Sequence, residues 1–199
     1  MFEITEYIGI IAFAMSGFFV AVRSRLDSLG VLISVFLTAF GGGIIRDVLV
    51  DRTPYTFTHD MPAVITIGVL IVLILFRFNK RATIENRFYF ILSDSIGLIS
   101  FSITGTMIAI ESALNLTGVL ALAFVTAVGG GITRDVIINE VPFVFKTGFY
   151  GTVSLLIGLV IYLLEKYDLL SVTALITVFI GGVVLRMVAY YKKWAVPMI

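Results

Sequence analysis

The chain lacks cysteine and has little charge, and these two absences exclude several classes of protein. Without cysteine it can hold neither disulfides nor thiolate metal sites, and its single histidine, His59, cannot form a metal cluster alone. Charged residues make up only 14% of the chain, and the net charge of +1 provides no basic field for a nucleic acid. We therefore expect no metal site, no other cofactor and no nucleic-acid partner.

Hydrophobic residues make up 59% of the 199 positions, and the mean hydropathy is +1.09. A soluble domain is about half apolar and about one quarter charged, and so short a chain could not bury this much apolar surface in water. The sequence therefore predicts a membrane protein. Its first apolar run follows Glu3 and Glu6 and precedes Arg23 and Arg25, the reverse of a signal peptide, so we expect this run to be retained.

Seven apolar runs approach the length of about 20 residues that a membrane-spanning helix requires. Short loops separate them and leave no room for a soluble domain, so we expect one transmembrane domain over residues 1–199. The runs are longer and more continuous than the segments of about 10 alternating residues that a β-barrel needs. The predicted spans are Tyr7–Val22, Leu29–Val50, Met61–Phe78, Phe88–Ile110, Leu116–Ile138, Phe143–Leu164 and Leu169–Tyr191.

Lysine and arginine in the loops predict the orientation of these spans. Arg46, Arg52 and Lys166 lie on the side of the N-terminus, whereas the other 11 of the 14 basic residues lie on the opposite side. Basic loops remain in the cytoplasm, so we expect a cell-membrane protein with its N-terminus outside and its C-terminus inside. The basic loop Arg77–Arg87 is interpreted mainly as a determinant of this topology, with contact to lipid headgroups as a second possibility.

The chain repeats itself at an offset of 88 residues. Between residues 9 and 57, 22 of 49 positions are identical to their partners at 97–145 without a gap. The repeats cover approximately residues 5–80 and 88–165, with three predicted spans each, and the helix over 169–191 lies outside them. Because three is odd, the second copy enters the membrane from the opposite face, which makes this an inverted repeat of the kind common among permeation proteins.

Each repeat carries a glycine triplet inside its second span, at Gly41–Gly43 and at Gly129–Gly131. Glycine costs about 1 kcal/mol per residue against alanine inside a helix. We therefore predict that helices two and five are broken at the triplets, with freed carbonyls and a negative helix end that suit a cation. The alternative is close packing, because small residues let membrane helices touch.

Polar side chains at matching depths suggest a wet path through the membrane. Ser16 and Thr104 are assigned to the ion pathway with the six glycines, although each could merely bond to its own helix backbone. The charged residues that match at the offset are assigned to the two pore mouths: Glu6, Arg46, Asp47, Asp94, Arg134 and Asp135.

We predict that these charges form one ion pair at each mouth, Glu6 with Arg46 and Asp94 with Arg134. The alternative is that they extend to the lipid interface. Asp47 and Asp135 are expected to stabilise the start of the second half of each broken helix.

Both copies of the pattern, "GGGIIRDVLVDRTPYTF" after "FAMSG" and "GGGITRDVIINEVPFVF" after "DSIGLISFSITGT", resemble the prokaryotic trimeric intracellular cation (TRIC) channels. These proteins are also grouped under a "glycine transporter" domain name. The resemblance covers nearly the whole chain. It implies seven helices in an inverted repeat, kinks at the two triplets, and a homotrimer with one pore in each protomer. It also implies conduction of monovalent cations, with potassium favoured. The lysine-containing motif that lines the pore region in animal members is not apparent here, and arginine follows the glycines in both repeats.

A potassium-permeable channel is thus the first hypothesis, with membrane lipid, monovalent cations and other copies of the chain as partners. The second is a secondary transporter of a small solute such as glycine, which would use the same inverted repeat. A membrane enzyme is not expected, because the sequence carries no recognisable nucleophile–base pair, metal-ligand set or phosphate loop. A purely structural subunit would not need two costly glycine triplets.

Overall fold

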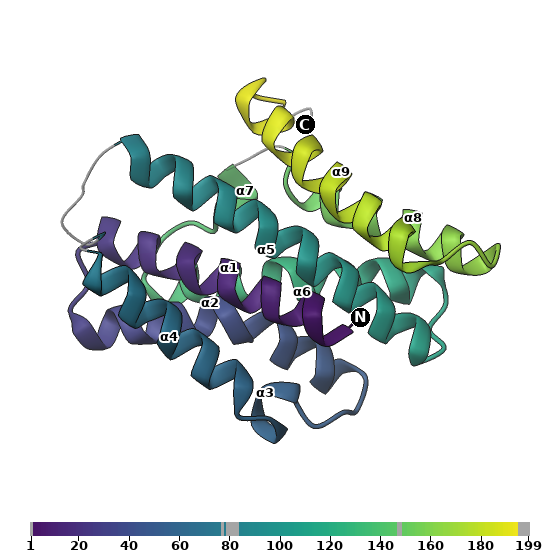
Figure 1. Ribbon diagram of the computed structural model, residues 1–199, viewed down its shortest axis with the longest axis horizontal. Coiled ribbons are helices and arrows are strands. Elements are labelled where there is room, and N and C mark those ends of the chain that lie inside the picture. Colours follow the sequence, from purple (N-terminus) through teal and green to yellow (C-terminus); the bar gives the residue numbers. More distant parts are fainter. Residues whose placement is uncertain (1, 77, 79–83, 147–148, 195–199) are drawn as a thin grey trace.

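The computed structural model describes residues 2–76, 78, 84–146 and 149–194, with the side chains of 84–87 excepted. Nine helices form within these ranges, two of them single turns (Figure 1). They are α1 (Phe2–Arg23), α2 (Ser28–Leu49), α3 (Tyr55–Thr58), α4 (Met61–Leu75), α5 (Ile84–Glu111), α6 (Leu116–Ile137), α7 (Phe143–Lys146), α8 (Gly151–Lys166) and α9 (Val172–Tyr191).

Five of these helices, α1, α2, α5, α6 and α9, are long and apolar enough to cross a membrane. The other two long helices are shorter: α4 has 15 residues and α8 has 16. The predicted span Phe143–Leu164 is not one helix, because α7 and α8 are separate elements in this region. Arg77, Lys80 and Arg81, which contribute to the predicted orientation, lie outside the described residues.

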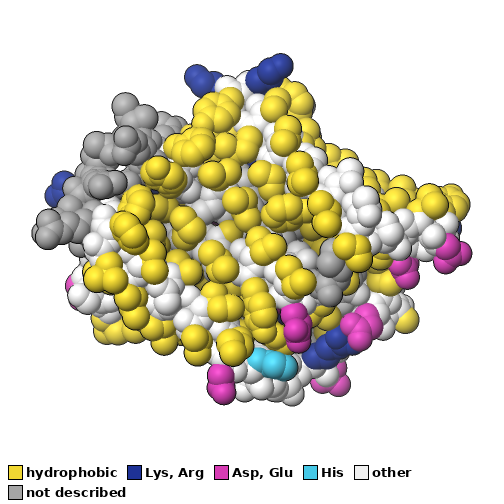
Figure 2. All heavy atoms as spheres, viewed as in Figure 1, with side chains coloured by type: hydrophobic (Ala, Val, Ile, Leu, Met, Phe, Trp, Pro, Cys, Tyr) yellow, Lys and Arg dark blue, Asp and Glu magenta, His cyan; other side chains and the backbone are white. Residues whose placement is uncertain are grey.

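Hydrophobic side chains cover most of the face shown in Figure 2, and charged side chains lie at its margins. On α9 the exposed residues Val172, Ile176, Ile180 and Val184 recur every four positions and form an outward apolar stripe. A helix bundle with so much exposed apolar surface is stable in lipid rather than in water. The chain is a multi-pass membrane protein.

Four helices form a ring at the centre of the molecule. In this ring α1 packs against α2 and α5, and α6 packs against α2 and α5, so α1 faces α6 across the ring and α2 faces α5. Figure 1 shows that α1 and α5 run in opposite directions. Outside the ring α4 packs on α1, α8 packs on α5 and α6, and α9 packs on α5 and α8.

The helices of the two repeats start in the same way. The Asp27 carboxylate accepts a hydrogen bond from the Gly30 N–H at 2.7 Å, and 88 positions later the Asn115 side chain accepts from the Gly118 N–H at 2.9 Å. Each side chain caps the first turn of a ring helix by satisfying an N–H group that has no partner within the helix. The sequence therefore fixes the start of α2 and of α6 locally.

The same ring helices also end in the same way. Asp51 and Asn139, one residue past the helix cap, adopt the left-handed conformation with φ of 57° and 60°. The next N–H groups, those of Arg52 and Glu140, donate back to the carbonyls of Asp47 and Asp135 at 2.9 and 2.8 Å. This is the Schellman ending of a helix, and it fixes the positions of Arg52 and Glu140 beside the ring.

The glycine triplets lie where α2 and α6 cross. A Cβ atom on Gly42 would overlap the carbonyl oxygen of Thr126, and one on Gly130 would overlap the carbonyl oxygen of Thr38. The predicted breaks are absent, because α2 and α6 each continue through their triplet as one α-helix. The propensity cost of glycine is offset here by backbone contact between two helices, which only residues without a side chain permit.

Two phenylalanine rings fill the middle of the α1–α5 contact. Phe13 and Phe101 meet edge to face with their centroids 5.1 Å apart, and both are fully buried. Each ring lies over a glycine of the other helix, Phe13 over Gly97 and Phe101 over Gly9. These four residues match at the 88-residue offset, so the contact brings together equivalent parts of the two repeats.

Candidate functional site

The first polar cluster of the ring is built around Arg46 near the C-terminal end of α2. Arg46 Nη1 donates to Glu6 Oε2 of α1 at 2.8 Å, and Nε donates to Asp47 Oδ1 at 2.7 Å. Nη1 also donates to the Thr104 hydroxyl of α5 at 3.2 Å. All four side chains are buried. Because a buried guanidinium is stable only when it is paired and its N–H groups are satisfied, these partners explain how the charge is tolerated.

The second polar cluster, 88 residues later, is built around Arg134 of α6. Arg134 Nε donates to Asp135 Oδ1 at 2.8 Å, and Nη1 donates to the Ser16 hydroxyl of α1 at 3.4 Å. Ser16 in turn donates to Asp94 Oδ1 of α5 at 3.1 Å. Each cluster therefore uses a hydroxyl from the other repeat, since Ser16 and Thr104 are equivalent positions.

Of the two predicted arginine–carboxylate pairs, Glu6–Arg46 is a direct ion pair in the structure, whereas Asp94–Arg134 is not. Glu6 and Arg46 form a direct ion pair of 2.8 Å. Among the described residues, Asp94 and Arg134 form no direct ion pair within 4.0 Å, and Ser16 lies between them instead. The physical reason is that aspartate is one methylene shorter than glutamate, so the Asp94 carboxylate does not reach the guanidinium directly.

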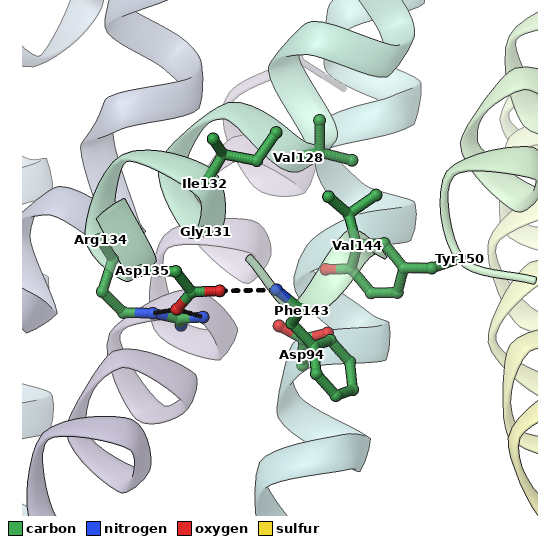
Figure 3. A pocket seen from close by; sticks show the side chains of 9 residues that line it. All are labelled: Asp94, Val128, Gly131, Ile132, Arg134, Asp135, Phe143, Val144 and Tyr150. Atoms are coloured by element: carbon green, nitrogen blue, oxygen red, sulfur yellow. Dashed lines mark hydrogen bonds and ion pairs between the residues drawn. The ribbon is translucent and has the colours of Figure 1, made fainter. Parts of the chain in front are cut away.

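The gap at the second cluster forms a small cavity. Figure 3 shows Asp94, Arg134 and Tyr150 around it, and Gly131 and Asp135 are also part of its lining. Its volume of about 10 Å³ is close to the least that holds one water. The first cluster closes on itself through a direct ion pair, so the two ends of the ring differ in this respect.

The third glycine of each triplet makes room for a cluster. A Cβ on Gly43 would lie 3.3 Å from Glu6 Oε1 and 3.7 Å from Arg46 Nη2, and one on Gly131 would lie 3.8 Å from Arg134 Nη2. The triplets therefore serve both the helix crossing and the charged clusters.

Asp47 and Asp135 have a different local role from the predicted one. Asp47 Oδ2 accepts a hydrogen bond from the Tyr55 N–H at 2.8 Å, and Asp135 Oδ2 accepts from the Phe143 N–H at 2.8 Å. Tyr55 and Phe143 are the first residues of α3 and α7. Each aspartate thus links its arginine to the short helix that follows the ring helix, rather than capping the second half of a broken helix.

One buried charge of this region was missed because it lies outside the duplication. Arg186 of α9 is 1% exposed, and its guanidinium lies over the Tyr150 ring at 4.8 Å from the centroid. Its Nε and Nη2 atoms have no hydrogen-bond partner among the described residues. Arg186 is the only charged residue within Val172–Tyr191, a signal that could have singled it out in the sequence.

Two further ion pairs lie at the ends of the ring. Arg23 Nη2 lies 2.8 Å from Glu140 Oε2, and Arg52 Nη2 lies 3.2 Å from Glu111 Oε1. Glu140 also accepts a hydrogen bond from the Ser24 hydroxyl at 2.9 Å. Partial burial of this carboxyl raises its pKa, but the Ser24 hydrogen bond and the Arg23 charge outweigh burial and hold the pKa below the usual value.

A helical ring of two antiparallel repeats, with a charged cluster toward each end and an apolar exterior, defines a class of duplicated membrane protein. The family described as "Glycine transporter" matches the chain twice, at residues 3–78 and 91–166. The membrane protein YvgT of Bacillus subtilis is 36% identical over 98% of this chain and 95% of its own length. The inner membrane protein YadS of Escherichia coli K12 is 31% identical over 78% of this chain and 74% of its own.

Solved structures of TRIC channels have the same fold as this chain. A crystal structure of a prokaryotic TRIC channel in 0.5 M KCl has a TM-score of 0.88 at 31% identity, and the match covers 96% of each chain. The TRIC channel orthologue of Rhodobacter sphaeroides has a TM-score of 0.87 at 25% identity, over 97% of this chain and 98% of that one. The chain belongs to this family of TRIC-type, "glycine transporter" domain proteins.

Proposed function

We propose that this protein is a monovalent cation channel, permeable to potassium, with one pore in each protomer of a homotrimer. The observation that carries the proposal is the pair of buried arginine–carboxylate clusters at equivalent positions of the central ring, in a fold shared with TRIC cation channels. Buried charges in a membrane domain are costly, and they commonly mark an ion pathway.

The balance of charge in the first cluster favours cations. The first cluster has two carboxylates, Glu6 and Asp47, for one guanidinium, Arg46, and so has an excess of one negative charge. In the second, Asp94 and Asp135 exceed Arg134 in the same way, and Arg186 lies close enough to Asp94 to offset that excess. A negative excess in a low-dielectric wall attracts cations and repels anions.

The pathway runs between α1, α2, α5 and α6, past the Gly41–Gly43 and Gly129–Gly131 crossing and the hydroxyls of Ser16 and Thr104. Phe13 and Phe101 fill the middle of the α1–α5 contact, and Phe101 also lies beside Gly42 of α2, so these rings obstruct the path in this conformation. Conduction therefore requires these helices to separate. The proposed topology has seven spans, with the N-terminus outside and the C-terminus in the cytoplasm, in the cell membrane.

Single-channel recording of the purified protein in a planar bilayer tests this function. With unequal potassium concentrations on the two sides, unitary currents should reverse near the potassium equilibrium potential. Glu6→Gln should reduce the preference for potassium over chloride, whereas Gly68→Ala on the outer helix α4, where a Cβ meets nothing within 4 Å, should leave it unchanged. Absence of unitary currents together with saturable glycine uptake into liposomes would refute the channel.

A further inference from the structure

The ion pairs Arg23–Glu140 and Arg52–Glu111, at the two ends of the ring, occupy equivalent positions of the repeat. At each position, one repeat has the positive residue and the other has the negative residue. Position 23 corresponds to 111 and position 52 corresponds to 140 at the 88-residue offset. The first repeat has arginine at both positions and the second has glutamate at both. The pairs therefore join the same two structural positions, with the cation always on the first repeat and the anion always on the second.

Each of these pairs crosses a diagonal of the ring. Arg23 is the last residue of α1, and Glu140 lies three residues past the end of α6, so this pair joins two helices that face each other across the ring. Arg52 lies three residues past the end of α2, and Glu111 is the last residue of α5, so the second pair joins the other two. One pair therefore lies across each end.

We propose that these pairs are latches across the two mouths of the pore, and that Glu140 and Glu111 recruit the incoming cation when their arginines release them. We refer to Arg23–Glu140 as the Glu140 latch and to Arg52–Glu111 as the Glu111 latch. The inference rests on the proposed function, since it assigns the pore to the ring. It adds two mouth carboxylates that lie outside the buried clusters.

The exposure of the latches suits a reversible contact. The side chains of Arg23 and Glu111 are 62% and 65% exposed, so water and salt compete for both ion pairs. Exposed ion pairs contribute little net stability, and thermal motion breaks them easily. The buried Glu6–Arg46 pair has no such access to water, so we assign it to the pore wall rather than to a latch.

The two latches differ in strength. Glu140 is held by Arg23 at 2.8 Å and by the Ser24 hydroxyl at 2.9 Å, and Lys146 Nζ lies 4.0 Å away. Among the described residues, Glu111 has one cationic partner, Arg52, whose Nη1 and Nη2 atoms each lie 3.2 Å from a carboxylate oxygen, and Glu111 is twice as exposed as Glu140, 65% against 30%. The Glu111 mouth should therefore open first, and the Glu140 latch should limit the rate of entry.

The test uses the opposite effects expected for the two members of one ion pair. In single-channel recordings of the full-length protein at low potassium concentration, Arg23→Gln should free the Glu140 carboxylate and increase the unitary conductance. Glu140→Gln should decrease it. A carboxylate about 6 Å from the ion path enriches cations about threefold in water, which sets the expected size of each change. At about 1 M salt both variants should match the wild type, because the charges are screened.

A structural salt bridge would give a different result, because removing either partner breaks the same bond. Arg25→Gln is the matched control: it removes an exposed arginine two residues away that forms no ion pair with any other described residue, and it should leave conductance unchanged. Arg52→Gln and Glu111→Gln repeat the test at the other mouth if the first pair of variants folds poorly, as judged by gel filtration.

Changes in the same direction for both partners, or no change in either, would refute the latches and leave the channel proposal intact as long as the wild type conducts. Absence of unitary currents from the wild type would refute the proposed function, and the latches with it.

Discussion

The glycine triplets allow a graded test of the helix crossing. Alanine adds one methyl group, and the structure determines what that group meets at each position. At Gly42 and Gly130 it would overlap a backbone carbonyl oxygen of the facing helix. At Gly41 it would lie 3.0 Å from the Cα of Gly130, again main chain. At Gly129 its nearest neighbour is the end of the Ile45 side chain at 3.1 Å, which can turn aside.

These contacts set the expected magnitudes. Forcing an extra methyl group into a packed interface costs about 1–3 kcal/mol, whereas replacing glycine by alanine in a helix gains up to about 1 kcal/mol. We expect Gly42→Ala and Gly130→Ala to be the most destabilising, because two helices must move apart. We expect Gly41→Ala to be intermediate and Gly129→Ala to be nearly neutral. For a chain of this size 1 kcal/mol corresponds to about 2–4 °C in the unfolding midpoint.

The assay is the apparent midpoint of thermal unfolding in detergent, measured at one heating rate because membrane proteins often unfold irreversibly. Gly68→Ala is the control, since its methyl group meets nothing within 4 Å. The reasoning would be refuted if Gly42→Ala and Gly130→Ala were as stable as Gly68→Ala. It would also be refuted if Gly129→Ala were the most damaging of the four triplet variants.

Three further predictions concern local features. Ala113 has a φ of 54°, a left-handed conformation that costs alanine about 1–2 kcal/mol. Ala113→Gly should therefore raise the unfolding midpoint by a few degrees, and a lower midpoint would contradict this. Arg46→Gln leaves two buried carboxylates unpaired and should lower the free energy of unfolding by about 3–5 kcal/mol. Adding Glu6→Gln to that variant should recover part of the lost stability, and a further loss would argue against the Glu6–Arg46 pair. Glu140 has a lowered pKa, so its ion pair should stabilise the protein at neutral pH and cease to do so as the pH falls below the usual glutamate value of 4.5. Wild type and Glu140→Gln should therefore differ in unfolding midpoint at pH 7 and converge in acid; a difference that persists in acid would count against the ion pair.

The 88-residue offset allowed the charged residues of the two clusters to be predicted. It placed Glu6 with Arg46 and identified the residues of the second cluster, because an inverted repeat brings equivalent positions to opposite ends. It could not predict that Ser16 of the first repeat joins the Arg134 cluster, or that Thr104 of the second repeat joins the Arg46 cluster. Such contacts cross between the repeats and depend on how α1 packs on α5.

The errors have physical causes as well. Helix propensity alone predicted a break at Gly41–Gly43, whereas contact with α6 keeps the helix continuous. Hydropathy joined residues 143–164 into one span, because it does not detect the short helix that Asp135 begins at Phe143. Arg186 escaped the comparison of repeats because α9 has no counterpart in the duplication.

The exchange of charge between the ends of the ring also bears on how the two halves of the chain recognise each other. Two copies of the first half, arranged in the same way, would bring arginine against arginine at both ends, and two copies of the second would bring glutamate against glutamate. Like charges at these distances repel. Only the mixed arrangement pairs opposite charges at both ends. The halves have therefore become complementary rather than interchangeable, and a chain built from two first halves would lack the electrostatic match that this protein has.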